Sequence, residues 1–210
     1  LNAPRCVASV IGHRVRTCHS PRPMARLAIL IPDMRRGGAE QVALTLIDGF
    51  VQRGHEVDLV LFNARGSLLQ FLPPQVRVVD LKARRIRSAI GPFVHYLRER
   101  KPDAIQASMW PVTLIAVIAR LISRVKSRLL ISDHSKLSAQ VLNKPGRRKL
   151  MGWSIRLLYP LADVRVCVSR AVAVELADIS GLRPDDFEVV HNPVEQRVGQ
   201  ANREAEAQWS

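Results

Sequence analysis

The chain has 210 residues, a length that fits one α/β domain and leaves little room for a second. Hydrophobic residues make up 47% of it, enough for a sizeable core, and charged residues make up an ordinary 24%. The formal net charge of +14 favours anionic partners such as phosphorylated substrates or anionic lipids. A nucleic-acid binder is not expected, because only 5% of the residues are aromatic and no recognition motif is present.

Cysteine usage and hydropathy exclude two further classes of protein. Cys6, Cys18 and Cys167 have no CxxC spacing, which argues against a disulfide framework or a zinc site and indicates an intracellular protein without a metal centre. The longest apolar stretch, residues 112–122, contains Arg120 and is shorter than the roughly 20 residues that a membrane span needs. We therefore expect a buried helix there.

Both ends of the chain differ from its middle. Residues 1–23 are rich in arginine and proline and contain no acidic residue, whereas Met24 opens directly onto a strand pattern. We expect the basic leader 1–23 to lie outside the fold and the domain to span residues 24–194. An Arg-rich targeting segment is the alternative for the leader. Residues 195–210 are polar and predict a tail or a truncated linker.

From Met24 onward, short β-branched runs alternate with amphipathic stretches. The runs predict strands at Arg26–Ile31, Glu56–Phe62, Val76–Leu81, Asp103–Ser108, Arg128–Ser132, Val164–Ser169 and Phe187–His191. Helical spacing predicts helices at Ala39–Arg53, Ile90–Arg100, Pro111–Ser123, Lys149–Tyr159 and Arg170–Ala177, the last capped by Ser169. The repeated strand–helix–strand order predicts an α/β fold, a doubly wound, mainly parallel Rossmann-like sheet with helices on both faces.

A glycine pair follows the first predicted strand. Sheets of this kind bind ligands at the carboxyl ends of their strands, where the strand order reverses. Gly37 and Gly38 allow the backbone to approach a ligand closely, and the free N–H groups of the first helical turn favour an anion such as phosphate. The spacing fits neither the dinucleotide fingerprint nor a Walker loop, so a tight turn that leads into a helix is the alternative.

An ordered set of motifs resembles glycosyltransferase family 4, whose members have the two-domain GT-B architecture. The set begins with P-x-M-x-x-G-G-A-E, which ends here at Glu40. The later motifs follow in order at Arg53–Val57, Lys101–Asp103, Ile131–Ser135, Tyr159–Asp163, Val168–Arg170 and Val190–Val194. The match extends from Met24 to Val194 and identifies the chain as an N-terminal, acceptor-side half of a GT-B protein.

The resemblance implies roles for particular residues. Gly37, Gly38 and Ala39 form the loop that faces the donor diphosphate, and His134 is the catalytic residue near the transferred sugar or the acceptor hydroxyl. Acceptor binding is expected of Glu40, Trp110 and Asp133. Each role has a structural alternative: a lone histidine often packs in a protein interior, a carboxylate in the first turn stabilises the helix dipole, and a tryptophan can belong to the core or its rim.

The donor side is not recognisable in this sequence. Members of the family hold a nucleotide sugar in a second Rossmann-like domain with a Glu-x7-Glu motif, and nothing after Val194 resembles it. We therefore expect this chain alone to be inactive, its donor half being lost by truncation or gene damage, or supplied by a partner chain. The nucleotide sugar is the expected co-substrate, without a tightly bound cofactor. Hexosyl transfer with retention follows from the resemblance only, and a non-catalytic binding subunit or remnant is the alternative.

A basic stretch predicts contact with a membrane surface. Residues 144–156 combine cations with apolar side chains, a composition typical of helices that lie on anionic membranes. The residues expected at that surface are Arg147, Arg148, Lys149, Trp153 and Arg156, and Lys82–Arg87 adds a second basic cluster. We expect a lipid-linked or membrane-adjacent glycan acceptor and a cytoplasmic protein, peripheral on the inner face of the membrane. The alternative is that these faces are simply solvated.

Overall fold

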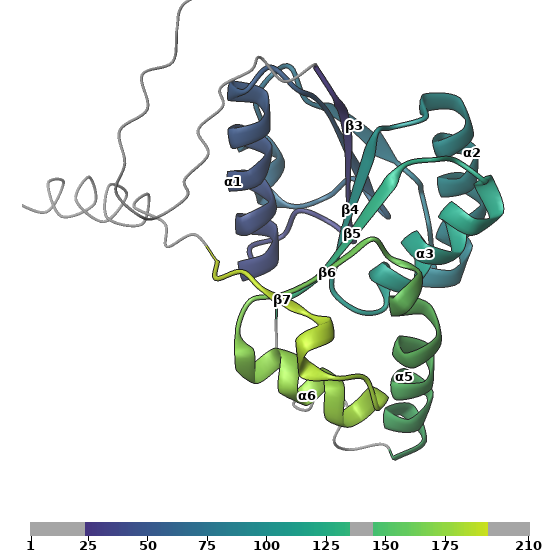
Figure 1. Ribbon diagram of the computed structural model, residues 1–210. Helices are drawn as coiled ribbons and strands as arrows, with labels where there is room; N and C mark the ends of the chain where they lie inside the picture. Colours follow the sequence, from purple (N-terminus) through teal and green to yellow (C-terminus); the bar gives the residue numbers. More distant parts are fainter. Residues whose placement is uncertain (1–23, 135–144, 193–210) are drawn as a thin grey trace, which may run out of the picture.

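Seven parallel strands form one sheet in the order β3-β2-β1-β4-β5-β6-β7 in the computed structural model, which describes residues 24–134 and 145–192 (Figure 1). The strands are β1 (Arg26–Ile31), β2 (Glu56–Leu61), β3 (Arg77–Asp80), β4 (Ala104–Ser108), β5 (Arg128–Asp133), β6 (Val164–Cys167) and β7 (Glu188–Val189). The predicted parallel, doubly wound sheet is confirmed. The leader 1–23 and the tail 195–210 lie outside the described residues.

Within the described residues, five α-helices connect the strands, together with short 3-10 helices. They are α1 (Gly38–Gln52), α2 (Ile90–Arg100), α3 (Val112–Ser123), α5 (Pro145–Leu158) and α6 (Arg170–Ser180). The predicted cap of α6 is confirmed, because Ser169 Oγ accepts a hydrogen bond from the backbone N–H of Val172 at 3.3 Å. The predicted start of α5 was wrong, because α5 begins at Pro145 and not at Lys149, and proline fits the first turn of a helix. The helix α6 also continues past the predicted end at Ala177 to Ser180.

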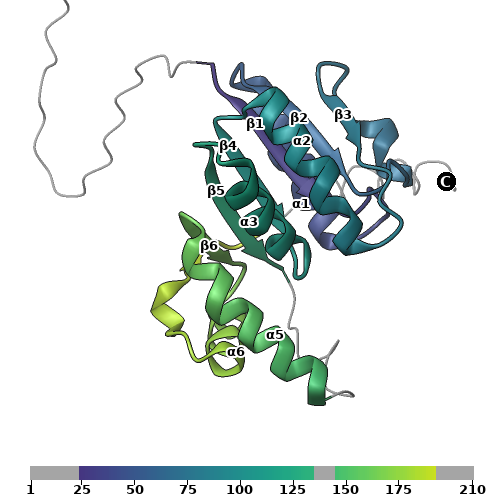
Figure 2. The ribbon, with the colours of Figure 1, turned by 90° about the vertical axis from the view of Figure 1, so that its right-hand side faces the viewer.

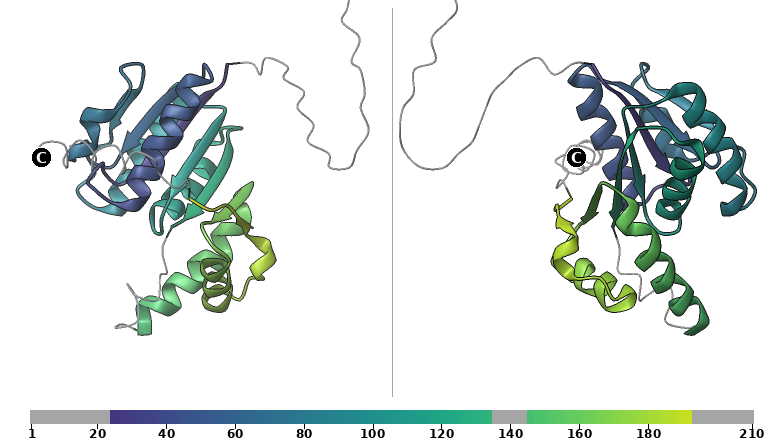
Figure 3. Two further views of the ribbon diagram at one scale, coloured as in Figure 1. Left: turned by 90° about the vertical axis from the view of Figure 1, so that its left-hand side faces the viewer. Right: turned by 45° about the vertical axis from the view of Figure 1, so that its right-hand side comes forward.

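The direction of each crossover decides which face of the sheet its helix covers. The chain steps one way from β1 to β3 and the opposite way from β3 to β7. Because crossovers between parallel strands are right-handed, α1 lies on one face, whereas α2, α3, α5 and α6 lie on the other (Figures 1 and 2). The left view of Figure 3 shows α1 beside an area of β4, β5 and β6 that no described helix covers.

Two hydrophobic clusters follow from this arrangement. Alternate residues of each strand face opposite sides, so Ala28 and Leu30 of β1 join the larger cluster with α2, α3, α5 and α6. Ile29 and Ile31 face the other way and pack in a smaller cluster with Ala43 and Ile47 of α1. A shift of β1 by one residue would exchange these two buried sets, so their burial fixes the register of β1 between β2 and β4.

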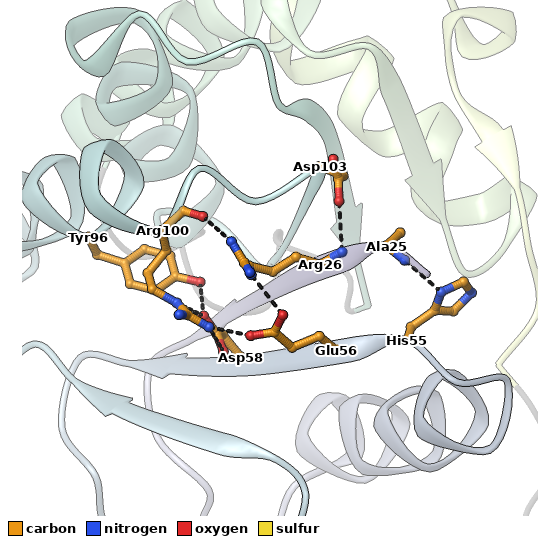
Figure 4. Close-up of polar contacts among 8 residues, drawn as sticks. All are labelled: Ala25, Arg26, His55, Glu56, Asp58, Tyr96, Arg100 and Asp103. Atoms are coloured by element: carbon orange, nitrogen blue, oxygen red, sulfur yellow. Dashed lines mark hydrogen bonds and ion pairs between the residues drawn. The ribbon is translucent and has the colours of Figure 1, made fainter. Parts of the chain in front are cut away.

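A buried carboxylate and its partners join β1, β2 and α2 at the amino edge of the sheet (Figure 4). Asp58 is fully buried, and its Oδ2 accepts hydrogen bonds from Tyr96 Oη at 2.8 Å and from Arg100 Nε at 3.1 Å. Arg100 also pairs with Glu56, which in turn pairs with Arg26 Nε at 3.0 Å. Burial raises the pKa of Tyr96, so the phenol stays protonated and remains a donor to Asp58.

Two of the sequence motifs belong to this amino edge. His55 Nδ1 lies 3.3 Å from the backbone nitrogen of Ala25, and Asp103 Oδ2 accepts from the backbone N–H of Arg26 at 2.8 Å (Figure 4). Both contacts satisfy backbone donors at the start of β1, which would otherwise lack a partner. The motifs at Arg53–Val57 and Lys101–Asp103 therefore support the fold, at the edge opposite to the carboxyl ends of the strands.

Candidate active site

The strand order reverses at β1, which lies between β2 and β4. Ligands of open α/β sheets bind beside such a reversal, outside the carboxyl ends of the strands. Four segments meet this edge because each directly follows a strand: the Gly37–Gly38 loop after β1, Trp110 after β4, His134 after β5 and Asn192 after β7. The structure thus brings the Gly37–Gly38 loop, Trp110 and His134, whose roles stay predictions, to one edge.

The loop between β1 and α1 is fixed by contacts with the loop that follows β2. The backbone N–H of Met34 donates to the carbonyl of Arg65 at 2.8 Å, and Asp33 pairs with Arg35 at 2.9 Å and with Arg65 at 3.5 Å. Gly66 has a φ of +123°, and a Cβ there would lie 2.1 Å from the Met34 carbonyl. Arg65 and Gly66 were not predicted from the sequence, because nothing in their local pattern marks this long-range contact.

The first turn of α1 is open on one side and covered by a carboxylate on the other. Gly37 is the extended N-cap and has no side chain to cap the helix. A Cβ on Gly37 would lie 2.2 Å from Glu40 Oε2, whereas a Cβ on Gly38 would meet nothing within 4 Å. Glu40 thus folds back over Gly37, where the positive end of the helix dipole favours a carboxylate.

His134 lies at the carboxyl end of β5, next to two buried serines. Its Nε2 is 3.0 Å from Ser132 Oγ, which is 2.9 Å from Ser108 Oγ. Its Nδ1 is buried and makes no hydrogen bond of acceptable geometry among the described residues. Burial lowers the pKa of His134, and this effect outweighs that of the nearby Asn192 side chain, which raises the pKa. The imidazole is therefore neutral at neutral pH.

Asp133 faces the other side of the sheet and is buried in the larger cluster. Its Oδ2 accepts from Tyr159 Oη at 2.9 Å, and the phenol oxygen lies 3.0 Å from Thr113 Oγ1. Burial raises the pKa of Asp133 to about 6, against the hydrogen bonds from Tyr159 and the backbone of Trp110. The acceptor-binding role of Asp133 stays a prediction, whereas its contacts make it an anchor for the turn that carries Trp110.

Trp110 connects the edge of the sheet with α5. Its Nε1 donates to Ser154 Oγ at 3.2 Å, and the half-buried indole packs against the larger cluster. The preceding residue, Met109, has a left-handed φ of 68°, and the Trp110–Pro111 peptide bond is cis. The indole therefore occupies the junction between β4 and α5.

An apolar groove of about 270 Å³ extends from α1 across the uncovered part of the sheet. Apart from Gln106 in the middle of β4, its polar members gather at the carboxyl edge, where Ser132, His134, His191 and Asn192 line it. The remainder is almost entirely apolar, lined by side chains that include Leu27, Val42, Leu46, Phe50, Leu130 and Val166. His134 thus lies at the polar end of a mainly apolar surface.

The helix α5 has apolar side chains on two opposite faces. Met151, Ile155 and the following Tyr159 are fully buried. Leu150, Trp153 and Leu157 form an outer stripe, with exposed fractions of 67%, 68% and 51%.

Cations flank this outer stripe of α5. Lys149 and Arg156 are exposed beside it, whereas Arg148 pairs with Asp178 of α6 at 3.0 Å. The side chain of Arg147 lies outside the described residues. The membrane-surface residues predicted from the sequence thus share α5, away from His134.

Within residues 24–134 and 145–192, no cluster of three or more His, Cys, Asp or Glu side chains has the arrangement of a metal site. The same residues contain no helix with the length and hydropathy that crossing a bilayer requires.

Known proteins resemble the chain in sequence and in structure. A curated relative from Campylobacter jejuni is 24% identical over 198 residues, which cover 84% of this chain and 50% of the relative. Its name is N-acetylgalactosamine-N,N'-diacetylbacillosaminyl-diphospho-undecaprenol 4-alpha-N-acetylgalactosaminyltransferase.

Two solved structures share the fold. HepE from Anabaena in complex with UDP and glucose superposes with a TM-score of 0.62 at 18% identity, covering 81% of this chain and 45% of HepE. The lipopolysaccharide outer core galactosyltransferase WaaB superposes with a TM-score of 0.57 at 17% identity, covering 81% of this chain and 46% of WaaB. The chain spans about half the length of these proteins.

A family model also matches most of the chain. The model of glycosyltransferase family 4 matches residues 36–197, a span that begins at the loop before α1 and includes every strand from β2 to β7. The sheet order, the carboxyl-edge loops and the structural neighbours agree with that match. The chain belongs to glycosyltransferase family 4 and forms an α/β domain of the GT-B type.

Proposed function

We propose that this chain is the acceptor-side half of a glycosyltransferase that transfers a sugar from a nucleotide-sugar donor to a lipid-linked or membrane-adjacent glycan. The observation that carries the proposal is the meeting of the α1 N-terminus and His134 at the edge where the strand order reverses. The donor half lies outside this chain, on a further part of the polypeptide or on a partner chain. On its own, this chain is inactive.

The first turn of α1 would face the diphosphate of the donor. Free N–H groups at a helix N-terminus favour anions, and the open surface at Gly38 leaves room for a phosphate group to approach the backbone. Arg35 and Arg36 are exposed in the same loop and add positive charge. A complex of HepE, a structural neighbour, contains UDP and glucose, which supports a nucleotide sugar as co-substrate without a tightly bound cofactor.

The outer stripe of α5 would bring the domain to an anionic membrane. An exposed Trp and two Leu side chains, flanked by Lys149 and Arg156, match the composition of helices that lie in the headgroup region. The inner face of the same helix binds Trp110 through Ser154. One helix therefore joins the proposed membrane contact to the proposed acceptor contact.

The names of two similar proteins support a lipid-borne acceptor. The Campylobacter relative is named for a diphospho-undecaprenol substrate, and WaaB is named for lipopolysaccharide. We infer that this protein acts peripherally on the inner face of a membrane. Transfer of a hexose with retention of configuration is the expectation that family membership adds.

Reconstitution of sugar transfer tests the proposal. The chain is mixed with the separately produced donor half of a relative, and transfer of radiolabelled sugar from UDP-sugars to undecaprenyl-diphosphate-linked glycans in vesicles is measured. We expect transfer with both halves, none with either alone, and a loss of at least about a hundredfold for His134→Ala.

A non-catalytic subunit that binds the acceptor or a partner chain is the second candidate. Vesicle flotation with and without the lipid-linked glycan separates the two. Acceptor-dependent flotation without transfer by any donor half would favour the binding subunit. Absence of both acceptor binding and transfer would reject both functions.

A further inference from the structure

An apolar pocket, the η2–α3 pocket, lies between the 3-10 helix η2 (Ile86–Ala89) and α3, on the face of the sheet that α2, α3 and α5 cover (Figure 2). Its volume is about 450 Å³, and its lining is almost entirely apolar. The apolar side chains that line it come from η2, α3 and the residues next to them: Ile86, Ile90, Pro111, Leu114, Ile115 and Ile118. The groove beside α1 lies on the opposite face of the sheet.

Two arginines, Arg85 and Arg87, also line the η2–α3 pocket. Both are exposed, and no carboxylate within residues 24–134 and 145–192 pairs with either of them or with the neighbouring Arg84. An arginine can lay its aliphatic stem along apolar surface while its guanidinium stays in water. The pocket therefore combines an apolar interior with positive charge at its rim.

The sequence around this pocket contains very few acidic side chains. Residues 81–98 include no Asp or Glu, and residues 104–162 include one, Asp133, which is only 2% exposed. Both α3 and α5 lie within the second of these ranges, so neither helix carries an exposed carboxylate. An anion that approaches this face therefore meets no charge of its own sign on either helix.

The apolar side chain of Ile86 is exposed between the two arginines, in a backbone conformation that a serine fixes. Ile86 is 46% exposed. Ser88 Oγ donates a hydrogen bond to the Arg85 carbonyl at 2.6 Å and accepts one from the Arg85 backbone N–H at 3.2 Å. These hydrogen bonds use only the backbone of Arg85, so η2 holds Ile86 and the flanking cations in place before any ligand binds.

We propose that the η2–α3 pocket is a second membrane contact, which takes part of an acyl chain of one anionic phospholipid while Arg85 and Arg87 bind the phosphate. Arginine suits this ligand because its fork of N–H donors fits two phosphate oxygens. The helix α3 contacts both η2 and α5, so the pocket and the outer stripe of α5 share one face of the domain. Two contacts would fix the orientation of the domain on a bilayer, whereas α5 alone would let it rotate about the helix axis. The site rests on the peripheral membrane binding proposed above but not on sugar transfer.

Methyl NMR of the full chain, labelled with 13C at the isoleucine δ1 methyls, tests the pocket. The probe is dihexanoyl phosphatidylglycerol below its critical micelle concentration, and Ile→Val substitutions assign the signals. We expect saturable shifts for Ile86 and Ile118 and none for Ile29 and Ile47, which pack beneath α1. Dihexanoyl phosphatidylcholine, which has no net charge, should bind at least about fivefold more weakly. Inorganic phosphate should not shift Ile118, because it has no chain to enter the pocket.

Substitutions separate this pocket from general positive charge. Arg85→Gln and Arg87→Gln should each weaken phosphatidylglycerol binding about fivefold, the effect of one cation beside an anionic lipid. Arg84→Gln is the matched control, because it removes the same charge from an adjacent exposed residue that does not line the pocket, and it should weaken binding less than about twofold. On vesicles that contain phosphatidylglycerol, Arg85→Gln should likewise reduce flotation more than Arg84→Gln does.

Three results would overturn the proposal. The first is the absence of a saturable shift at Ile86 and Ile118, and the second is an equal loss of binding for Arg84→Gln and Arg85→Gln. The third is the same shift of Ile118 with inorganic phosphate, which would indicate a site for free phosphate. Titration of the parent chain decides even if a variant does not fold. Failure of sugar transfer leaves these shifts in place, and absence of the shifts leaves sugar transfer and the α5 contact intact, so the two proposals fail separately.

Discussion

Asp133 and His134 are neighbours in sequence, yet their side chains lie on opposite faces of the sheet. Asp133 accepts a hydrogen bond from Tyr159 in the larger hydrophobic cluster, whereas His134 contacts Ser132 and lines the groove beside α1. This follows from the alternation of side chains at the end of β5. One short motif therefore supplies both an internal anchor and a residue that faces the proposed ligand.

The buried Asp133 should make the protein less stable as the pH rises. Burial raises the pKa of Asp133 to about 6, above its ordinary value of 3.8, so the folded state binds more protons than the unfolded state between these values. The free energy of unfolding should thus lose about 3 kcal/mol between roughly pH 4 and pH 7 through this group. Urea denaturation across this range, compared with Asp133→Asn, measures the effect.

The pH dependence of stability also contains a contribution from His134, which is present in both the parent chain and Asp133→Asn. Burial lowers its pKa, so it contributes stability that increases with pH and partly masks the effect of Asp133. The difference between the Asp133→Asn and parent curves isolates the carboxyl. A pH-independent difference would mean that Asp133 is not a buried acid.

Removal of Arg100 should destabilise the amino edge without affecting the carboxyl edge. Arg100→Leu leaves the fully buried Asp58 with Tyr96 as its remaining hydrogen-bond donor, and such a loss costs about 3–5 kcal/mol. Tyr96→Phe should cost about 1 kcal/mol. Chemical denaturation measures both values. Equal losses of unfolding free energy for Arg100→Leu and Tyr96→Phe would contradict the prediction that the ion pair contributes more than the phenol hydrogen bond.

The crossing of α5 and α6 depends on a glycine. A Cβ on Gly152 would lie 2.1 Å from the backbone carbonyl oxygen of Ile179, and backbone moves only with its whole helix. We expect Gly152→Ala to cost about 1–3 kcal/mol, because it forces the helices apart. Gly146→Ala on the same helix meets nothing within 4 Å and should be neutral or slightly stabilising. Thermal unfolding of both variants checks this contrast.

The outer stripe of α5 should govern binding to anionic vesicles. Trp153→Glu removes apolar contact area and adds repulsion, and we expect at least a tenfold loss of binding in flotation assays. Lys149→Gln and Arg156→Gln should each weaken binding about fivefold, because a cation near anionic lipid contributes about 1 kcal/mol.

A matched substitution separates the stripe from overall charge. Arg124→Gln removes an exposed cation that follows α3 and should change vesicle binding little. Equal losses for Arg124→Gln and Arg156→Gln would show that net charge alone causes the binding. Binding that does not weaken with salt would contradict an electrostatic contribution.

Local patterns were sufficient to predict the sheet. Every predicted strand is present, because buried parallel strands are short β-branched runs between glycine, proline and polar residues. The predicted end of β7 at His191 was too long, since an edge strand pairs on one side only and Glu188–Val189 are the residues that pair with β6. The sequence alone does not reveal such a loss of partners.

The candidate site was predicted less completely than the fold. His134 and the Gly37–Gly38 loop were found from their places after strands, and the structure brings both to the predicted edge. The burial of Asp133 was not foreseen, because its partner Tyr159 comes from a helical segment far away in the sequence. Ser108 was missed for the same reason: its contact with Ser132 depends on strand register.

The crossovers after β3 all advance in one direction, and this limits how the sheet can grow. A further unit added beside β7 by a right-handed crossover would place its helix with α5 and α6, on the side that is already covered. Lengthening the sheet at that edge therefore never shelters the groove next to α1. A segment can cover the groove only if it does not continue this series of crossovers and instead crosses to the face that carries α1. The exposure of the groove therefore follows from the direction of the crossovers and not from the side chains that line it.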